Sequence, residues 1–212
     1  MSAMDELLAS GAPPIVAILR GVRPDEVGAI GRALVNAGVR LIEVPLNSPD
    51  PFDGIAALAA AVSADALVGG GTVLDVTDVD KVRAAGGHLI VSPNTDAGVI
   101  ARAVALGLEP MPGFMTPSEA FAAIRAGARR LKLFPAGALG MAHLKAVREV
   151  LPRAVVVWTV GGAGASNLAE WIGAGAAGIG VGGSLYKPGD SAQMVGERAA
   201  ALVAAWAAVR SV

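Results

Sequence analysis

Short apolar segments follow stretches of helical periodicity at regular intervals along the chain. Each helical stretch ends at a glycine, and an apolar run begins within a few positions of it. Glycine readily adopts the left-handed backbone that commonly ends an α-helix. A run that is apolar on both faces is typical of a parallel strand covered on both sides. Five such junctions are evident, at Gly38, Gly86, Gly107, Gly127 and Gly175.

The spacing of these glycines predicts eight strand–helix units. Two intervals are 21 and 20 residues long, whereas Gly38 to Gly86 and Gly127 to Gly175 each span 48 residues. Each long interval therefore holds two units of about 24 residues. We predict strands at residues 15–19, 40–44, 66–69, 88–91, 108–111, 129–133, 154–158 and 177–181. We predict helices at residues 24–36, 50–61, 76–84, 95–105, 116–125, 140–149, 165–173 and 190–209, with a short helix over residues 3–9 before the first strand.

Eight alternating units predict an α/β fold of the (β/α)8 TIM-barrel type. A length of 212 residues suits one such domain, and neither a linker nor a low-complexity segment interrupts it. We therefore expect residues 1–212 to form a single barrel domain with a short N-terminal helix. An open, doubly wound sheet is the alternative that the same alternation allows.

Composition narrows the classes of function. The apolar fraction of 54% supplies a large core, and a net charge of −1 leaves no basic surplus for nucleic acid or an anionic membrane. Because the chain has no cysteine, disulfides and thiolate–metal sites are excluded. We find neither an apolar run of about 18 residues nor a signal peptide, so we expect a cytoplasmic protein.

Polar, charged and glycine residues stand where the predicted strands end. In a TIM barrel the carboxyl ends of the strands meet at one mouth, where active sites are built. These residues can therefore belong to one site. In chain order they are Arg20, Glu43, Thr72, Ser92, Pro93, Pro112, Lys132, Gly161, Gly162 and residues 182–184.

Lys132 and Glu43 are the two charged residues that strand alternation turns into the barrel. Lys132 lies between two leucines, and Glu43 lies between Ile42 and Val44. If these apolar neighbours face the helices, both charges face inward. Burial lowers the pKa of a lysine, and the neutral amine can attack a ketone, while a nearby carboxylate can transfer protons. The alternatives are a lysine that extends to solvent and an ion pair that merely neutralises Lys132.

Two further features suit an anionic substrate. Arg20 could bind a carboxylate, or it could simply be a solvent-exposed arginine at the start of a loop. Glycine-rich segments follow the seventh and eighth predicted strands, at residues 159–167 and 180–186. Loops at these positions bind phosphate in many barrels through backbone N–H groups. The alternative is that these glycines serve only the turns.

Other motifs in the chain do not carry a function. Gly178, Gly180 and Gly183 match the G-x-G-x-x-G pattern, but no acidic residue follows at the required distance. His88 is expected at the bottom of the barrel and His143 within a helix, so neither is a candidate metal ligand. We predict neither a cofactor nor a metal.

The chain resembles the 2-keto-3-deoxy-6-phosphogluconate/6-phosphogalactonate aldolase family from about Ile15 to Tyr186. The matching segments are AILRG, IEVPLNSP, GGGTVL, IVSPN, MPGFMTPSEA, LKLFPA, VGGAGASNLAEWIGAGA and GIGVGGSLY. The resemblance implies a class I aldolase, which is a lyase, with Lys132 as the Schiff-base lysine and Glu43 as the general acid/base. It further implies a pyruvate-carboxylate subsite, an aromatic neighbour of the imine and a phosphate subsite. The carboxylate subsite would consist of Arg20, Thr72 and Pro93, and the aromatic neighbour would be Phe134. The phosphate subsite would consist of Gly161, Gly162, Gly182, Gly183 and Ser184.

Two positions separate the branches of this family. The gluconate type resembles E-[VI]-T-x-R-[TS] after the second strand and T-G-G after the seventh. Here Asn47 and Val160 replace the arginine and the threonine, which resembles the galactonate type. The substrates differ only in configuration at C4, so loss of a hydroxyl at Val160 removes one hydrogen bond that could distinguish them. The final GGSLY segment is closer to the gluconate type.

The expected activity is cleavage of 2-dehydro-3-deoxy-6-phosphogalactonate to pyruvate and D-glyceraldehyde 3-phosphate, a step of galactonate catabolism. Its C4 epimer, 2-dehydro-3-deoxy-6-phosphogluconate, is the alternative substrate. A phosphate-binding barrel isomerase or epimerase and a non-catalytic sugar-phosphate binder are the alternatives of another class. The resemblance also implies a homotrimer.

Overall fold

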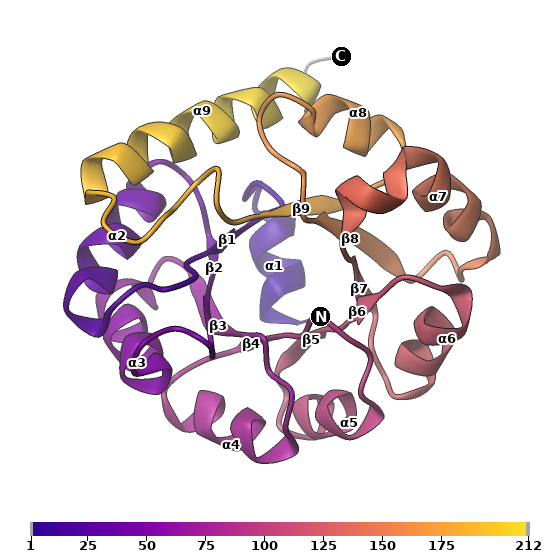
Figure 1. Cartoon of the computed structure of the whole chain (residues 1–212), viewed down its shortest axis with the longest axis horizontal. Helices are drawn as coiled ribbons and strands as arrows, with labels where there is room; N and C mark the ends of the chain where they lie inside the picture. The colour runs from indigo at the N-terminus through magenta and orange to yellow at the C-terminus, as the bar shows by residue number, and fades with distance from the viewer. Residues whose placement is uncertain (1, 211–212) are drawn as a thin grey trace.

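The predicted strands form an inner barrel, and the predicted helices surround it (Figure 1). The protein is described by a computed structural model that covers residues 2–210. The strands are β1 (Ile15–Ile18), β2 (Leu41–Pro45), β3 (Leu67–Gly71), β4 (Leu89–Val91), β5 (Glu109–Met111), β6 (Gly113–Phe114), β7 (Arg130–Leu133), β8 (Val156–Val160) and β9 (Gly178–Val181). The helices are α1 (Ala3–Ala9), α2 (Pro24–Asn36), α3 (Pro51–Val62), α4 (Val76–Ala84), α5 (Ala97–Ala105), α6 (Pro117–Arg125), α7 (Ala136–Val150), α8 (Leu168–Gly173) and α9 (Ala192–Arg210).

All recorded strand pairs are parallel, and the strands follow one another around a nearly closed barrel. The fifth predicted strand, residues 108–111, corresponds to β5, and a short strand that was not predicted, β6, follows it after Pro112, which has no N–H to donate to a neighbouring strand. Strand β5 pairs with β4 and β6 pairs with β7, while the Lys132 N–H donates to the carbonyl of Pro112 (2.9 Å). This short strand accounts for nine strands where eight were predicted.

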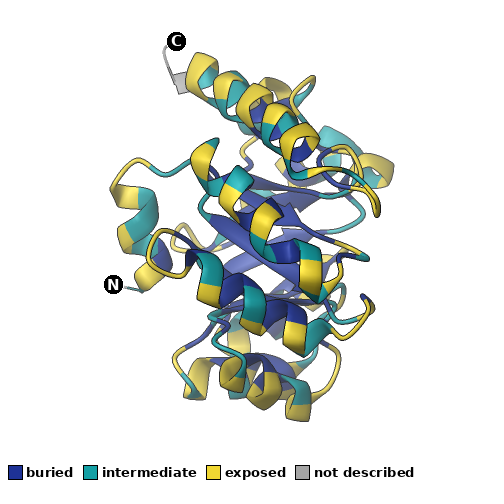
Figure 2. Ribbon diagram, turned by 90° about the vertical axis from the view of Figure 1, so that its left-hand side faces the viewer, coloured by how far each residue is buried: buried dark blue, intermediate teal, exposed yellow. Residues whose placement is uncertain are grey.

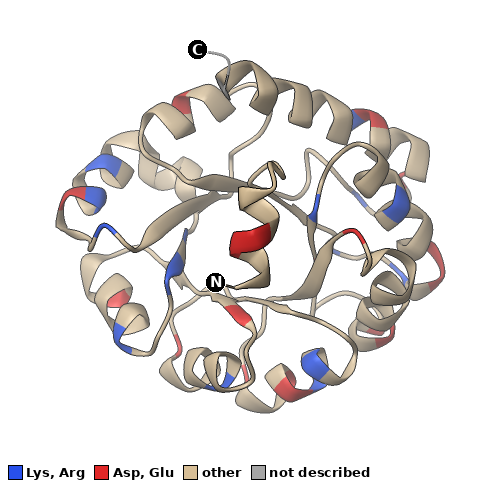
Figure 3. Cartoon of the chain, turned by 180° about the vertical axis from the view of Figure 1, so that it is seen from behind, with Lys and Arg blue, Asp and Glu red and all other residues tan. Residues whose placement is uncertain are grey.

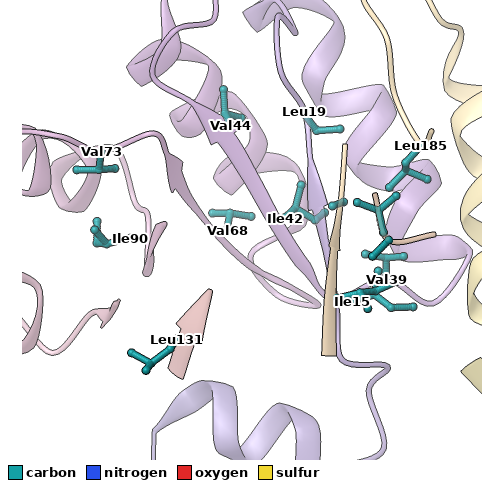
Figure 4. Packing of buried hydrophobic residues seen from close by; sticks show 14 of the residues in the cluster. Ile15, Leu19, Val39, Ile42, Val44, Val68, Val73, Ile90, Leu131 and Leu185 are labelled. Carbon is teal, nitrogen blue, oxygen red and sulfur yellow. The ribbon is translucent and has the colours of Figure 1, made fainter. Parts of the chain in front are cut away.

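The larger core lies between the barrel and its helices. Strand residues that face outward, such as Ile42, Val68, Ile90 and Leu131, pack in this layer (Figure 4). The helices bury their inner faces against it and expose their outer faces (Figure 2). Because alternate strand residues enter this layer, the residues between them necessarily point into the barrel.

A smaller core fills the barrel and is closed at one end by α1. Met4 of α1 packs with inward-facing residues that include Val16, Leu41 and Trp158. Figure 3 shows α1 lying across the end of the barrel that faces the viewer. Asp5 of α1 forms an ion pair with the buried Arg130 at the start of β7. The N-terminal ends of the strands are therefore covered, and the site must open at the other end.

Most helix boundaries lie within two residues of their predicted positions, but two helix starts differ by three or four. Helix α7 begins at Ala136, not at 140, and the backbone at Gly140 leaves the helical region (φ 80°). Glycine adopts this conformation without steric cost, so the chain can form a turn before the break. Helix α8 begins at Leu168, not at 165. No helix within residues 2–210 is long and apolar enough to cross a membrane.

Candidate active site

Lys132 points into the barrel from the middle of β7. Leu131 and Leu133 pack in the outer core, so alternation places the lysine on the opposite face. Only 6% of Lys132 is exposed. The structure thus confirms the predicted inward direction, and Lys132 does not extend to solvent.

Glu43 points into the barrel from β2 for the same reason. Ile42 and Val44 belong to the outer core, whereas Glu43 lies on the inner face with 2% of its surface exposed. Its Oε2 atom is buried and has no hydrogen-bond partner among the described residues. An acceptor that is buried without a partner is costly, which favours a functional explanation for this carboxyl group.

Burial shifts the pKa values of both groups toward their neutral forms. Burial raises the pKa of Glu43 to about 7, although the positive charges of Lys132 and Arg20 oppose the change. Burial lowers the pKa of Lys132, opposed by Glu43 and assisted by Arg20. Among the described residues, no ion pair within 4.0 Å joins Glu43 to Lys132. The contact ion pair that the sequence left open is therefore not formed.

Phe134 connects Lys132 to a large open cavity. The Lys132 Nζ atom lies 4.8 Å from the centre of the Phe134 ring, and this ring lines the cavity. Lys132 itself lines a much smaller space directly below. Ile18, Val160 and Gly180 line both spaces. The amine therefore lies beneath the floor of the cavity rather than on its wall.

The open cavity has a volume of about 700 Å³ and is lined by all five residues of the predicted phosphate site. It brings together segments that follow β1, β7, β8 and β9, as the barrel mouth predicts. Eight of the predicted site residues line it: Arg20, Phe134, Val160, Gly161, Gly162, Gly182, Gly183 and Ser184. Glu43, Lys132, Thr72, Pro93 and Asn47 do not.

The glycine loops offer unpaired backbone donors at this cavity. Within residues 2–210, no recorded hydrogen bond uses the N–H groups of Gly162, Ala163, Gly183 or Ser184. Gly162 has φ 90°, a value that L-residues rarely adopt. Donors that cluster without protein partners at a cavity can bind an anion such as phosphate.

Arg20 is held by the loop that follows β2. Its Nη1 donates to Oδ1 of Asn47 (2.5 Å), and the next N–H, from Gly21, donates to Oγ of Ser48 (2.9 Å). These two bonds join the first and second loops of the mouth. Asn47 therefore contacts Arg20 rather than lining the cavity.

Thr72 and Pro93 follow β3 and β4, outside the group of segments that line the large cavity. Thr72 has φ 55°, which is unusual for a β-branched residue and indicates local strain. The hydroxyl of Ser92 donates to the Val73 carbonyl (2.7 Å), and the Val73 N–H donates to Val91 (3.2 Å). Ser92 thereby fixes the loop that carries Thr72.

Sequence reasoning missed several residues of this mouth. Ser166, Tyr186 and Lys187 line the cavity, and the Tyr186 hydroxyl donates to Oε1 of Glu26 (2.9 Å). Asn167 holds the loop after β8, since its Nδ2 donates to the Gly162 carbonyl (2.8 Å) and its Oδ1 accepts from the Gly164 N–H (2.9 Å). Long-range pairs such as Tyr186 with Glu26 leave no local sequence signal.

Neither histidine lines the large cavity. His88 lines a cavity beside α1 at the closed end, and His143 lies in α7 with Nε2 2.7 Å from the Met115 carbonyl oxygen. Across residues 2–210, no group of three or more His, Cys, Asp or Glu residues could hold a metal ion. The positively charged groups on the cavity wall are Arg20 and Lys187.

Comparison with known proteins agrees with this architecture. The sequence model of the KDPG and KHG aldolase family matches residues 7–198. The chain is 46% identical to a 2-dehydro-3-deoxy-6-phosphogalactonate aldolase of Escherichia coli (strain K12), over 91% of this chain and 94% of the relative. It is 45% identical to a Rhizobium meliloti (strain 1021) protein named "Probable 2-dehydro-3-deoxy-6-phosphogalactonate aldolase", over 92% of each.

A solved structure supports the same relationship. The "Native KDPGal structure" superposes with a TM-score of 0.92 at 44% identity, over 94% of this chain and 97% of that one. The match of the family model spans nearly the whole barrel, and the barrel holds an inward lysine and glutamate below a glycine-lined cavity. The chain belongs to the KDPG and KHG aldolase family.

Proposed function

We propose that this chain is a 2-dehydro-3-deoxy-6-phosphogalactonate aldolase that acts through a Schiff base on Lys132. The observation that carries the proposal is the buried Lys132, whose pKa is lowered by burial, with Glu43 as its neighbour in the barrel. The two relatives described above carry this activity in their names, and the name of the solved structure contains KDPGal.

The first half of the proposed reaction forms an iminium ion. The neutral Lys132 amine attacks C2 of the substrate, and the carbonyl oxygen takes a proton to give a carbinolamine. Protonated Glu43 then supplies the second proton, through a water molecule, that lets this oxygen leave as water. The resulting iminium ion is an electron sink beside the C3–C4 bond. A carboxyl group with a pKa of about 7 can both donate and accept protons near neutral pH.

The second half breaks the carbon–carbon bond. The Glu43 carboxylate removes the proton of the C4 hydroxyl, C4 becomes the aldehyde of D-glyceraldehyde 3-phosphate, and the C3–C4 electron pair moves onto the iminium to form an enamine. Protonation of the enamine at C3 gives the pyruvate iminium. Water then adds at C2, which releases pyruvate and restores the free amine. Protons and electrons balance without an added cofactor.

The cavity supports the binding of a substrate with two anionic groups. The unpaired N–H groups of Gly162, Ala163, Gly183 and Ser184 would bind the phosphate at one side of the mouth. Arg20, held by Asn47, would bind the pyruvate carboxylate together with the loops that carry Thr72 and Pro93. Phe134 would cover the imine, since its ring lies 4.8 Å from Nζ.

In this proposal, Val160 determines which of the two C4 epimers the enzyme prefers. This side chain lines both the cavity and the space around Lys132, so it lies where C4 would pass. A valine cannot hydrogen-bond a C4 hydroxyl, whereas the threonine of the gluconate type can. Parallel measurement of kcat/KM on the two epimers tests this preference, and a higher value for the gluconate epimer would favour the alternative substrate.

Trapping with borohydride tests the mechanism directly. Pyruvate and sodium borohydride should fix one pyruvate-derived adduct on Lys132, located by peptide mass spectrometry. Lys132→Ala should remain folded, form no adduct and lose nearly all cleavage activity. An adduct on another lysine, or none with the wild-type protein, would reject the Schiff-base mechanism.

The same measurements separate the rival classes. A phosphate-binding isomerase or epimerase shares the glycine loops but does not require an amine that exchanges the methyl protons of pyruvate. Exchange that persists in EDTA would exclude it, and binding without turnover would support a non-catalytic binder. We further propose a homotrimer, which light scattering of the purified protein would test.

A further inference from the structure

The Glu43 carboxyl group occupies the place where a side chain at Gly71 would begin. A Cβ atom built on Gly71 would lie 1.8 Å from Oε2 of Glu43, 2.2 Å from its Cδ and 2.4 Å from its Oε1. These are the three nearest atoms, so the carboxyl group lies directly over the glycine. Gly71 ends β3, and Glu43 projects from the neighbouring β2.

The backbone of Gly71 does not itself require a glycine. Its φ angle lies outside the left-handed region, unlike those of Gly161 and Gly162, so an alanine could adopt the same conformation. What an alanine lacks at this position is space. Since a side chain of any size begins with Cβ, only glycine leaves the carboxyl group where it is.

From this geometry we infer that Gly71 is a positioning residue that sets the location of the Glu43 carboxyl group. The inference rests on the proposed role of Glu43 in proton transfer. Gly71 lines neither the large cavity nor the space around Lys132, so the inference assigns its effect to Glu43 and not to direct contact with the substrate.

The size of the displacement predicts its effect. Ordinary van der Waals contact with a Cβ atom begins near 3.4 Å, so Oε2 would have to move by at least 1.6 Å (3.4 minus 1.8). The clashing atoms form the end of a flexible side chain, so Gly71→Ala should fold with the carboxyl group displaced. Misplacement of a catalytic group by about 1 Å can reduce the rate by about 100-fold. We expect a loss of this order in kcat, with little change in KM.

Gly70 provides a matched control on the same strand. A Cβ atom at Gly70 would lie 2.7 Å from Cγ2 of Val82, on the outer side of the barrel. Gly70→Ala therefore introduces the same methyl group with a milder clash, which is directed against α4 and not against Glu43. It should lower stability but leave kcat within a few-fold of the wild-type value. Equal losses of kcat in the two variants would overturn the inference.

A double-mutant cycle with Glu43→Asp shows whether Gly71 acts through the carboxyl group. Asp is shorter by one methylene and withdraws from the added methyl group. The double variant should therefore be no slower than Glu43→Asp alone, and its pH–rate profile should resemble that of Glu43→Asp. Losses that multiply would show that Gly71 acts independently of Glu43 and would reject the inference.

Two further results keep this test decisive. If Gly71→Ala does not fold, the Gly71→Ala/Glu43→Ala variant should fold, because the clashing group is gone; failure of both would overturn the inference. Borohydride trapping of the wild-type protein tests the proposed function separately. A wild-type adduct together with unchanged kcat in Gly71→Ala would reject the role of Gly71 and leave the Schiff-base mechanism intact.

Discussion

Replacement of Glu43 by glutamine should make the protein more stable at pH 8 and abolish its activity. Gln has nearly the same shape as Glu but carries no charge, so it can fill the same position over Gly71. The wild-type carboxylate must be ionised at a site where only 2% of the residue is exposed. The cost of that buried charge is present in the wild-type protein above neutral pH and absent in the variant.

The magnitude follows from the pKa of Glu43, which burial raises from 4.5 to about 7. Between these values the folded protein keeps a proton that the unfolded chain has released. Stability from this group is therefore complete below pH 4.5 and is lost as the pH rises through 7. The full difference is about 3 kcal/mol, and most of it falls between pH 5 and pH 8.

Lys132 changes the size of this effect but not its sign. Without the Glu43 carboxylate, nothing opposes the lowering of the Lys132 pKa by burial, so the ammonium form becomes more costly at low pH. That cost is greater at pH 5 than at pH 8. The advantage of Glu43→Gln over the wild type therefore still increases with pH. The same substitution in a Lys132→Met background isolates the contribution of Glu43.

Urea unfolding at pH 5 and pH 8, at one protein concentration, provides the assay. The difference in unfolding free energy between Glu43→Gln and the wild type should increase by about 2–3 kcal/mol, equivalent to roughly 5–10 °C in Tm for a chain of this size. Glu149→Gln, on an exposed position of α7, serves as the control and should show no such increase. A difference that is the same at both pH values would refute the reasoning.

Three further outcomes are expected. Asn167→Ala removes the side chain that holds Gly162 and Gly164. It should raise KM for the phosphorylated substrate about tenfold with kcat nearly unchanged. An unchanged KM would show that the loop is rigid without this side chain. Val160→Thr should shift the ratio of kcat/KM values toward the gluconate epimer by about tenfold, and an unchanged ratio would contradict its role. Arg130→Ala leaves two carboxylates without their buried partner and should lower the unfolding free energy in urea by about 3 kcal/mol. A loss below about 1 kcal/mol would show that this network is effectively exposed.

Strand alternation was sufficient to predict the inward direction of the two central charges. The leucines beside Lys132 and the apolar neighbours of Glu43 face the outer core. Because successive side chains of a strand point to opposite faces, Lys132 and Glu43 must point into the barrel. The glycine spacing predicted the eight units because each helix must end before the next strand begins. These are local or periodic properties, which a single sequence expresses directly.

The distances between segments could not be predicted in this way. The 2.5 Å bond between Arg20 and Asn47 joins residues 27 positions apart, and its geometry depends on how two loops leave the barrel. The extra strand β6 also depends on register, because Pro112 donates to neither neighbour while its carbonyl accepts from Lys132. The sequence pattern identifies such residues as polar or as proline, but it does not show which residue each of them hydrogen-bonds.

Glycines inside the strands illustrate the same limit and suggest a common rule for this barrel. Gly178 leaves room for the Trp158 ring, and Gly180 leaves room for Val160, since added Cβ atoms would lie 2.7 Å from those side chains. Gly71 does the same for Glu43 on the opposite side. In each case a glycine of one strand faces a larger inward residue of the strand beside it. The interior is thus filled by side chains of β2 and β8 because β3 and β9 supply none at these levels. These glycines determine where the functional side chains can lie, although their sequence pattern alone suggests only turns or nucleotide binding.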